Sequence, residues 1–267
     1  MTHATPAAGS LEHARLMQAA IRSDACRSRD VESIGPFVAT FHPADSNLFL
    51  NYAIPEEGAR PTSDDVAALT AAYGARYRTP RLEYLPTLAP DVEPALVRAG
   101  FTVEGRLRLL TCASVADLVE TEVDGVRLLP ATTEDDYRGV AAVQWDAYEE
   151  QGAVPQRVVD SLRRSTATGG VVVLARDLTS GEPVGAGQCT RAHEGLTELT
   201  SVGVRARYRR RGIAQALTAR ISRDAFAGGA TGVFLMARGE PEAGIYERAG
   251  FRREGEVLHT SLKDEPR

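Results

Sequence analysis

Residues 202–215 read VGVRARYRRRGIAQ and join a strand-like pattern to a helical one. The run that leads into them, Leu196 to Val204, is rich in apolar and β-branched residues, as is typical of a strand. After the arginines, apolar residues recur at the spacing of one helix face, at positions 213, 216, 217, 221 and 225. The sequence therefore predicts a strand, a short loop that contains glycine, and the start of a helix.

A loop of this kind is suited to binding an anion. The first turn of a helix presents backbone N–H groups that have no partner within the helix, at the positive end of the helix dipole. Those groups can hold a diphosphate without a metal ion. Gly212 and the small Ala214 would allow phosphate groups close to the backbone, and the neighbouring arginines would add charge attraction.

The rest of the C-terminal half reads as an ordered series of strands and helices. Three β-rich runs separated by turn residues, at 171–175, 184–190 and 196–204, predict an antiparallel meander. The other predicted elements are helices from about 133 to 149, after Pro155, from 213 onward and around Tyr246, a strand at 233–236, a strand beginning at Phe251 and a last strand at about 256–262.

With these elements in place, the chain resembles the GNAT superfamily of acyl-CoA N-acyltransferases. The family's phosphate-binding motif, Q/R-x-x-G-x-G/A directly after a strand, is matched by Arg209, Gly212 and Ala214. The resemblance implies that acetyl-CoA is bound as a cosubstrate and that no metal takes part. The implied cofactor-binding residues are Val202, Gly203 and Val204, whose backbone would hold the pantetheine arm, and Arg209, Arg210, Arg211, Gly212, Ile213, Ala214 and Gln215, which would wrap the diphosphate.

The family's architecture also implies how the thioester carbonyl is stabilised. A backbone N–H near Val202 to Val204, on a strand splayed from its neighbour, would hold the developing negative charge. Two positions depart from the family's pattern, because Ala206 stands where many members have a proline and Gly239 where many have an asparagine. The second departure concerns the geometry on the substrate side.

Acetylation of an amine needs a neutral amine, a polarised carbonyl and a proton for the departing thiolate. Tyr246 lies in a segment that resembles the family's Y-E-K-x-G-F sequence, which implies that its hydroxyl faces the CoA sulfur as the general acid. The alternative is a tyrosine half-buried for packing. Glu198 is the candidate base, directly or through water, against the alternative of an exposed strand glutamate. Glu149, Glu150 and His193 are weaker candidates.

A repeat with a shift of 150 residues relates the two halves of the chain. Residues 95–105 read ALVRAGFTVEG and residues 245–255 read IYERAGFRREG, so that six of eleven positions agree. Each segment predicts a helix that ends at a left-handed glycine and continues as a strand. A chance match is the alternative to duplication. The predicted domains are a loose tail at 1–10, a degenerate GNAT-like domain at 11–120 and a catalytic GNAT N-acetyltransferase domain at 121–267.

The N-terminal half lacks the arginine and glycine pattern of the predicted diphosphate-binding loop at 209–215. A shift of 150 residues lands on Pro61, Thr62 and Ser63, and Tyr246 corresponds to Leu96, which cannot donate a proton. We expect a copy that has lost CoA binding. Its predicted elements are a strand at 47–54, a helix at 63–75 and a strand at 81–85. The predicted fold class is α+β, with two tandem GNAT-like domains, each a mixed, mostly antiparallel twisted sheet flanked by helices.

Composition limits the remaining functions. A net charge of −5 argues against non-specific nucleic-acid binding, and no apolar run approaches the roughly 20 residues that span a bilayer. Three scattered cysteines predict neither disulfides nor a zinc site. We expect a cytoplasmic monomer or homodimer that acts on a small-molecule or peptide amine. Two alternatives remain, a catalytically silent acyl-CoA-binding or regulatory module and a nucleic-acid-binding protein that uses Arg205 to Arg211.

Overall fold

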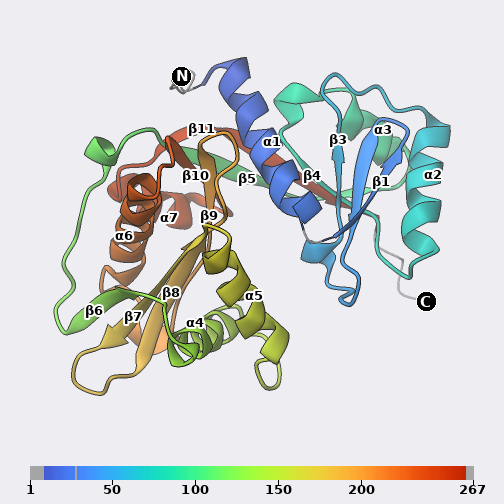
Figure 1. Cartoon of the computed structure of the whole chain (residues 1–267). Coiled ribbons are helices and arrows are strands. Elements are labelled where there is room, and N and C mark those ends of the chain that lie inside the picture. Colours follow the sequence, from blue (N-terminus) through green and yellow to red (C-terminus); the bar gives the residue numbers. More distant parts are fainter. Residues whose placement is uncertain (1–8, 28, 263–267) are drawn as a thin grey trace. The chain divides into compact units, whose positions relative to one another are not determined.

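The computed structural model describes residues 9–27 and 29–262, which form two compact units (Figure 1). The C-terminal unit comprises Leu110–Arg253, and the described residues of the N-terminal unit are 9–109 and 254–262. Both boundaries between the units fall inside strands, which differs from the predicted boundary near residue 120. Most of the predicted tail at 1–10 lies outside the described residues.

The C-terminal unit is built on five neighbouring strands in the order β10-β9-β8-β7-β6. Neighbours from β6 to β9 are antiparallel, and β10 runs parallel to β9. The elements are β6 (Val126–Pro130), α4 (Glu134–Ala147), α5 (Gln156–Ala167), β7 (Val171–Asp177), β8 (Pro183–Cys189), β9 (Leu196–Val204), α6 (Ile213–Ala227), β10 (Gly232–Ala237), α7 (Glu240–Arg248) and the start of β11 (Arg252–Ser261). The predicted meander and its helices are confirmed.

One detail of the predicted order is wrong. The residues after the Gly250 corner form a single strand, β11, whereas two successive strands were predicted there. No neighbouring atom would lie within 4 Å of a Cβ added to Gly255, and the strand passes through it without interruption.

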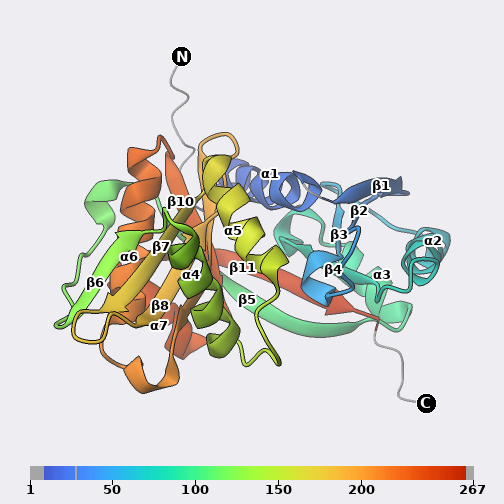
Figure 2. The same ribbon diagram turned by 60° about the horizontal axis from the view of Figure 1, so that its bottom comes forward.

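Helices cover both faces of the C-terminal sheet. Helices α4 and α5 lie side by side on one face, where Val172, Leu174 and Ala186 join their core (Figures 1 and 2). On the other face, Val173 and Ala175 pack in the core that includes α6 and α7. Because successive strand residues point to opposite faces, a strand buried on both sides is apolar throughout. The run Val171 to Ala175 is therefore apolar at every position, without alternating polar residues.

The N-terminal unit contains strands in the order β1-β2-β3-β4-β11-β5. Its elements are α1 (Leu11–Arg27), β1 (Asp30–Ile34), β2 (Phe37–Phe41), β3 (Ala53–Pro55), α2 (Ser63–Gly74), β4 (Arg81–Tyr84), α3 (Val92–Arg98) and β5 (Thr102–Cys112). The predicted helix at 63–75 and strand at 81–85 are confirmed. The predicted strand at 47–54 is mostly wrong, because the Asn47 side chain caps a short 3-10 helix at Leu48–Leu50 and only β3 follows.

The two repeated corners share their backbone conformation. Gly100 has φ +90° and Gly250 has φ +103°, so each ends its helix in the left-handed region, as predicted. Their surroundings differ. A Cβ at Gly250 would lie 2.0 Å from the carbonyl oxygen of Asp117, whereas one at Gly100 would meet only Leu262 at 3.6 Å. The chain before β6 thus passes directly over the Gly250 corner.

The fold class is α+β, with mixed, mostly antiparallel strands and helices on their faces. Among the helices of the described chain, none has the length and apolar character that crossing a membrane requires.

Candidate functional site

The parallel strands β9 and β10 pair along only part of their length. Their register joins Gly232 with Leu196, Val233 with Thr197 and Phe234 with Glu198. Strand β9 continues to Val204 and β10 to Ala237 without further pairing in this register. The strands therefore part after Glu198, and the β9 backbone at 202–204 lies beyond the ladder with β10. This is the arrangement that a ligand inserted between two strands requires.

A β-bulge interrupts β9 just before this segment. The register with β8 joins Ala186 to Gly203 and Gln188 to Thr200, so two β9 residues face Gly187 alone. The first of them, Ser201, has φ +55°, which is unusual for a residue with a side chain. The Gln144 side chain of α4 donates a hydrogen bond to the Ser201 carbonyl oxygen over 3.1 Å. Bulges redirect backbone groups, and here the redirected groups are those of the diverging segment.

The loop after β9 leads to an open helix start. Gly212 is the N-cap residue of α6, with φ +83°, and carries no side chain that could occupy the first-turn N–H groups. Ala216 makes the first helical bond, donating to the Gly212 carbonyl oxygen over 3.0 Å. Arg210 also has positive φ, at +62°, so the loop turns sharply before the helix. The N–H groups of Ile213, Ala214 and Gln215 precede the helical ladder and remain available for an anion.

The arginines of this loop fall into two groups. Arg205 pairs with Asp146 over 3.0 Å and with Glu182, and Arg207 also pairs with Glu182. These two charges are already compensated by carboxylates of the same unit. The other three, Arg209, Arg210 and Arg211, are exposed.

Two of the three exposed arginines are held by neutral groups. The Arg209 Nε donates to the carbonyl oxygen of Val204 over 3.1 Å, and the Arg211 Nη2 donates to the carbonyl oxygen of Asp124 over 3.1 Å. The Arg211 guanidinium also stacks on the Tyr208 ring, 5.5 Å from its centroid. Within the described residues neither guanidinium forms an ion pair with a carboxylate, so positive charge remains next to the start of α6, which favours an anion there.

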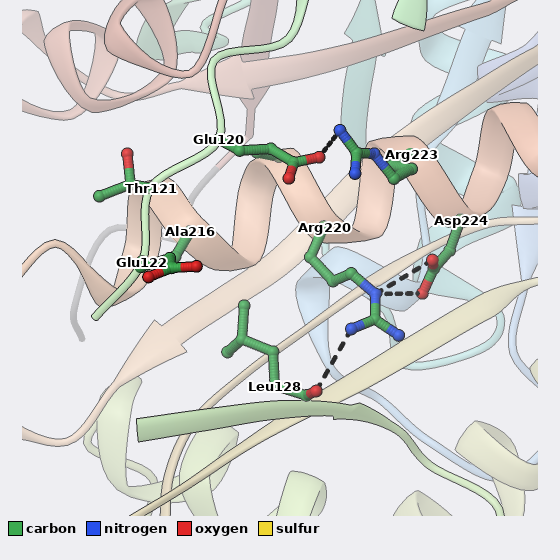
Figure 3. A pocket seen from close by; sticks show the side chains of 9 residues that line it. Glu120, Thr121, Glu122, Leu128, Ala216, Arg220, Arg223 and Asp224 are labelled. Carbon is green, nitrogen blue, oxygen red and sulfur yellow. Dashed lines mark hydrogen bonds and ion pairs between the residues drawn. The ribbon is translucent and has the colours of Figure 1, made fainter. Parts of the chain in front are cut away.

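A cavity of about 370 Å³ lies along the side of α6, from Ala216 at the end of its first turn to Asp224. Its two arginines are already paired, Arg223 with Glu120 and Arg220 with Asp224 and the Leu128 carbonyl oxygen (Figure 3). This cavity is therefore a poor site for an anion. Its lining residues are Glu120, Thr121, Glu122, Leu128, Ala216, Ala219, Arg220, Arg223 and Asp224.

Tyr246 lies on α7 and is only 7% exposed. Its hydroxyl donates to Glu242 Oε1 over 3.4 Å, a long hydrogen bond. Burial raises the pKa of the phenol well above its usual value, and the negative charge of Glu242 adds to the effect. The phenol is protonated at neutral pH, as it also is at its ordinary pKa, and the raised pKa makes it a weaker acid.

Glu198 lies at the vertex where the strands part, since it forms the last pair of the β9–β10 register. It is half-buried, and its backbone N–H and carbonyl are bound to Thr190. The weaker candidates Glu149 and Glu150 are exposed and lie just after the end of α4 at Ala147. His193 forms an isolated bridge with Leu196 at the opposite end of β9 from the loop. Among residues 9–27 and 29–262, no cluster of His, Cys, Asp or Glu could hold a metal ion.

The equivalent helix start in the N-terminal unit is closed. Thr62, the N-cap of α2, accepts a hydrogen bond from the Asp65 N–H, and the Asp65 carboxylate accepts one from the Thr62 N–H. Asp64 makes this first turn more acidic. A helix start whose donors are used and whose charge is negative does not suit a diphosphate. Leu96, the counterpart of Tyr246, is fully buried.

Known proteins resemble the chain over this site and beyond it. Residues 137–251 match the model of the acetyltransferase (GNAT) family. A GCN5-related N-acetyltransferase from Kribbella flavida is 27% identical, with 94% of this chain and 96% of that chain covered and a TM-score of 0.78. A GCN5-related N-acetyltransferase from Sphaerobacter thermophilus is 15% identical, with coverage of 95% and 92% and a TM-score of 0.67.

A tandem arrangement also occurs among the similar structures. A tandem GNAT protein from the clavulanic acid biosynthesis pathway is 13% identical, with 98% of this chain and 99% of that chain covered and a TM-score of 0.61. At that identity the likeness concerns the fold alone. No curated protein matches the chain.

Proposed function

Since the chain belongs to the GNAT superfamily of acetyltransferases, we propose that it transfers an acetyl group from acetyl-CoA to an amine by direct attack in a ternary complex. The observation that carries the proposal is the open start of α6, directly after a strand that parts from its parallel neighbour. A diphosphate and an extended arm attached to it would fit these two features.

In the proposed complex, the N–H groups of residues 212–215 bind the CoA diphosphate, and Arg209, Arg210 and Arg211 add positive charge. The β9 backbone at Val202 to Val204 binds the pantetheine arm. A backbone N–H of this segment would stabilise the thioester carbonyl oxygen as negative charge develops on it. No residue has to form a covalent intermediate, because bringing the amine and thioester together supplies much of the rate enhancement.

The chemical step joins the amine nitrogen to the carbonyl carbon and breaks the bond from that carbon to sulfur. Tyr246 is the proposed general acid that gives its proton to the departing thiolate. Glu198 is the proposed base, directly or through water, that makes the amine neutral before attack. The acceptor is proposed to be a small-molecule or peptide amine, and the protein is proposed to be cytoplasmic and either a monomer or a homodimer.

The N-terminal unit is proposed to be a degenerate copy that supports the acetyltransferase without binding CoA. The closed start of α2, capped by Thr62 and flanked by acidic residues, supports this assignment. A nucleic-acid-binding role for the arginine loop is less well supported. Arg205 and Arg207 are already paired with carboxylates, and Tyr208 is the one aromatic residue between Arg205 and Arg211.

Thermal unfolding with and without acetyl-CoA, followed by an amine screen, tests the proposed function. Acetyl-CoA at 100 times its Kd should stabilise the fold by about 2.7 kcal/mol, because it binds the folded state alone. The screen measures release of free CoA thiol with alkylamines, amino acids, amino sugars and peptides. Stabilisation without thiol release would favour a silent binding module, and no stabilisation at millimolar acetyl-CoA would count against both roles.

A further inference from the structure

Glu242 shares helix α7 with the proposed acid and lies one turn before it. Its Oε1 accepts the hydroxyl proton of Tyr246 over 3.4 Å, and its Oε2 accepts the backbone N–H of Arg238 over 2.7 Å. The second bond fixes the carboxylate at the start of α7. The first directs the only proton of the Tyr246 hydroxyl toward a carboxylate instead of a thiolate.

Glu242 differs from the other glutamates of α7 in its ion pairing. Glu240 and Glu247 both pair with Arg253, with N to O distances of 2.6 Å in each pair. Within the described part of the chain, no arginine or lysine side chain pairs with Glu242. A half-buried carboxylate that forms no ion pair is a suitable partner for an ammonium group brought by a substrate.

Tyr148 provides a second aromatic group near the same carboxylate. It follows the last residue of α4, and 52% of the residue is exposed although its hydroxyl is partly desolvated. Desolvation of its hydroxyl and the charge of Glu242 raise the pKa of Tyr148 to about 12, against the opposing effect of Arg238. The Glu242 charge therefore acts on both hydroxyls, and aromatic faces near a carboxylate favour a cationic amine.

We propose that Glu242 binds the nitrogen of a cationic primary amine and passes a proton from that nitrogen to Tyr246. The inference rests on the proposed function and names the acceptor class and a further residue of the same site. An acceptor that carries positive charge would compete for the Glu242 carboxylate, and the Tyr246 hydroxyl would then be free to turn its proton toward sulfur.

The protons balance along this route. The ammonium loses one proton to Glu198 or water and becomes a neutral amine. Attack forms the bond from nitrogen to carbon, and the nitrogen gives its second proton to Glu242. The bond from carbon to sulfur breaks, Tyr246 protonates the thiolate, and Glu242 returns its proton to the Tyr246 oxygen. The products are the amide, free CoA thiol and one proton released to solvent.

Glu242→Gln tests the inference, with Glu240→Gln as the matched control from the same helix turn. With the best amine of the screen, we expect Glu242→Gln to lower kcat about 30- to 100-fold and to raise the KM for the amine. The KM for acetyl-CoA should stay within about twofold, because the diphosphate site is elsewhere. Glu240→Gln should change each constant by less than about twofold, because the ion pair of Glu240 with Arg253 lies at the surface.

The double variant Glu242→Gln/Tyr246→Phe separates a proton route from a structural role. If Glu242 acts on the chemical step through Tyr246, the double variant should have a kcat less than about threefold below that of Tyr246→Phe alone. Independent, multiplied effects of the two substitutions would overturn the inference, as would a Glu242→Gln enzyme that behaves like Glu240→Gln. A wild-type chain that releases no thiol with any amine would instead remove the proposed function, and this inference with it.

Discussion

Tyr246→Phe should lower kcat about 100- to 1,000-fold and leave the Kd for acetyl-CoA within about threefold. The substitution removes one hydroxyl from a side chain that is 93% buried and otherwise keeps the ring that packs near Phe251. Loss of the proton donor slows departure of the thiolate but does not touch the diphosphate site. Steady-state release of CoA thiol gives kcat, and calorimetric titration gives the Kd.

Tyr84→Phe is the control for this substitution. Tyr84 is fully buried, but it belongs to the N-terminal unit and to strand β4. Removing its hydroxyl should leave kcat unchanged within about twofold, because the group takes no part in the chemical step. An unchanged kcat in Tyr246→Phe would remove this tyrosine as the acid, and an equal loss in both variants would point to general destabilisation.

Ala214→Pro should weaken acetyl-CoA binding about 10- to 100-fold, because proline removes one N–H from the proposed diphosphate site. Ala214 is the second residue of α6, where the N–H makes no bond within the helix. Proline is tolerated in the first turn, and α7 of this chain already has Pro241 there. The measurement is calorimetric titration of each variant with acetyl-CoA.

Asp64→Pro provides the matched control at the same position of α2. Asp64 is exposed, and the Thr62 cap binds the N–H of the next residue, so the substitution spares the cap. Acetyl-CoA should bind this variant with the wild-type Kd. If Ala214→Pro folds with an unchanged melting temperature and also keeps the wild-type Kd, the N–H of residue 214 does not take part in binding.

The features that the sequence predicts well are local ones. The start of α6 follows from a change of apolar spacing at Ile213 and from a glycine before it, both of which act within a few residues. The corners at Gly100 and Gly250 follow from the same kind of signal, because only glycine adopts their φ values without strain. The loop between β9 and α6, where we propose that the diphosphate binds, is predicted by the same local signals.

The features that the sequence misses depend on register and tertiary contact. The bulge at Ser201 exists because β8 and β9 pair out of step around Gly187, and the glycines at 187 and 203 do not by themselves show which β9 residue is extra. The pairing of β11 with β4, which joins Leu258 to Tyr84, is a contact between distant parts of the chain. It also explains why residues 254–262 belong to the N-terminal unit rather than to the domain predicted for them.

The candidate site shows the same division. The seven residues Arg209 to Gln215 were predicted from the motif, but the sequence could not show which loop arginines are already paired. Asp146 and Glu182, which compensate Arg205 and Arg207, come from two other elements of the fold. The proposed role of Glu242 does not follow from the sequence, because a glutamate in the first turn of a helix is ordinarily read as a favourable dipole contact.

The amide resonances of the isotope-labelled chain during a titration with CoA test the central claim most directly. If the start of α6 binds the diphosphate, the N–H signals of Gly212, Ile213, Ala214 and Gln215 should show the largest shifts, and those of the α2 start at Ser63 and Asp64 should stay in place. Signals at 212–215 that stay fixed while CoA saturates the protein would place the diphosphate elsewhere and remove the basis of the proposed function.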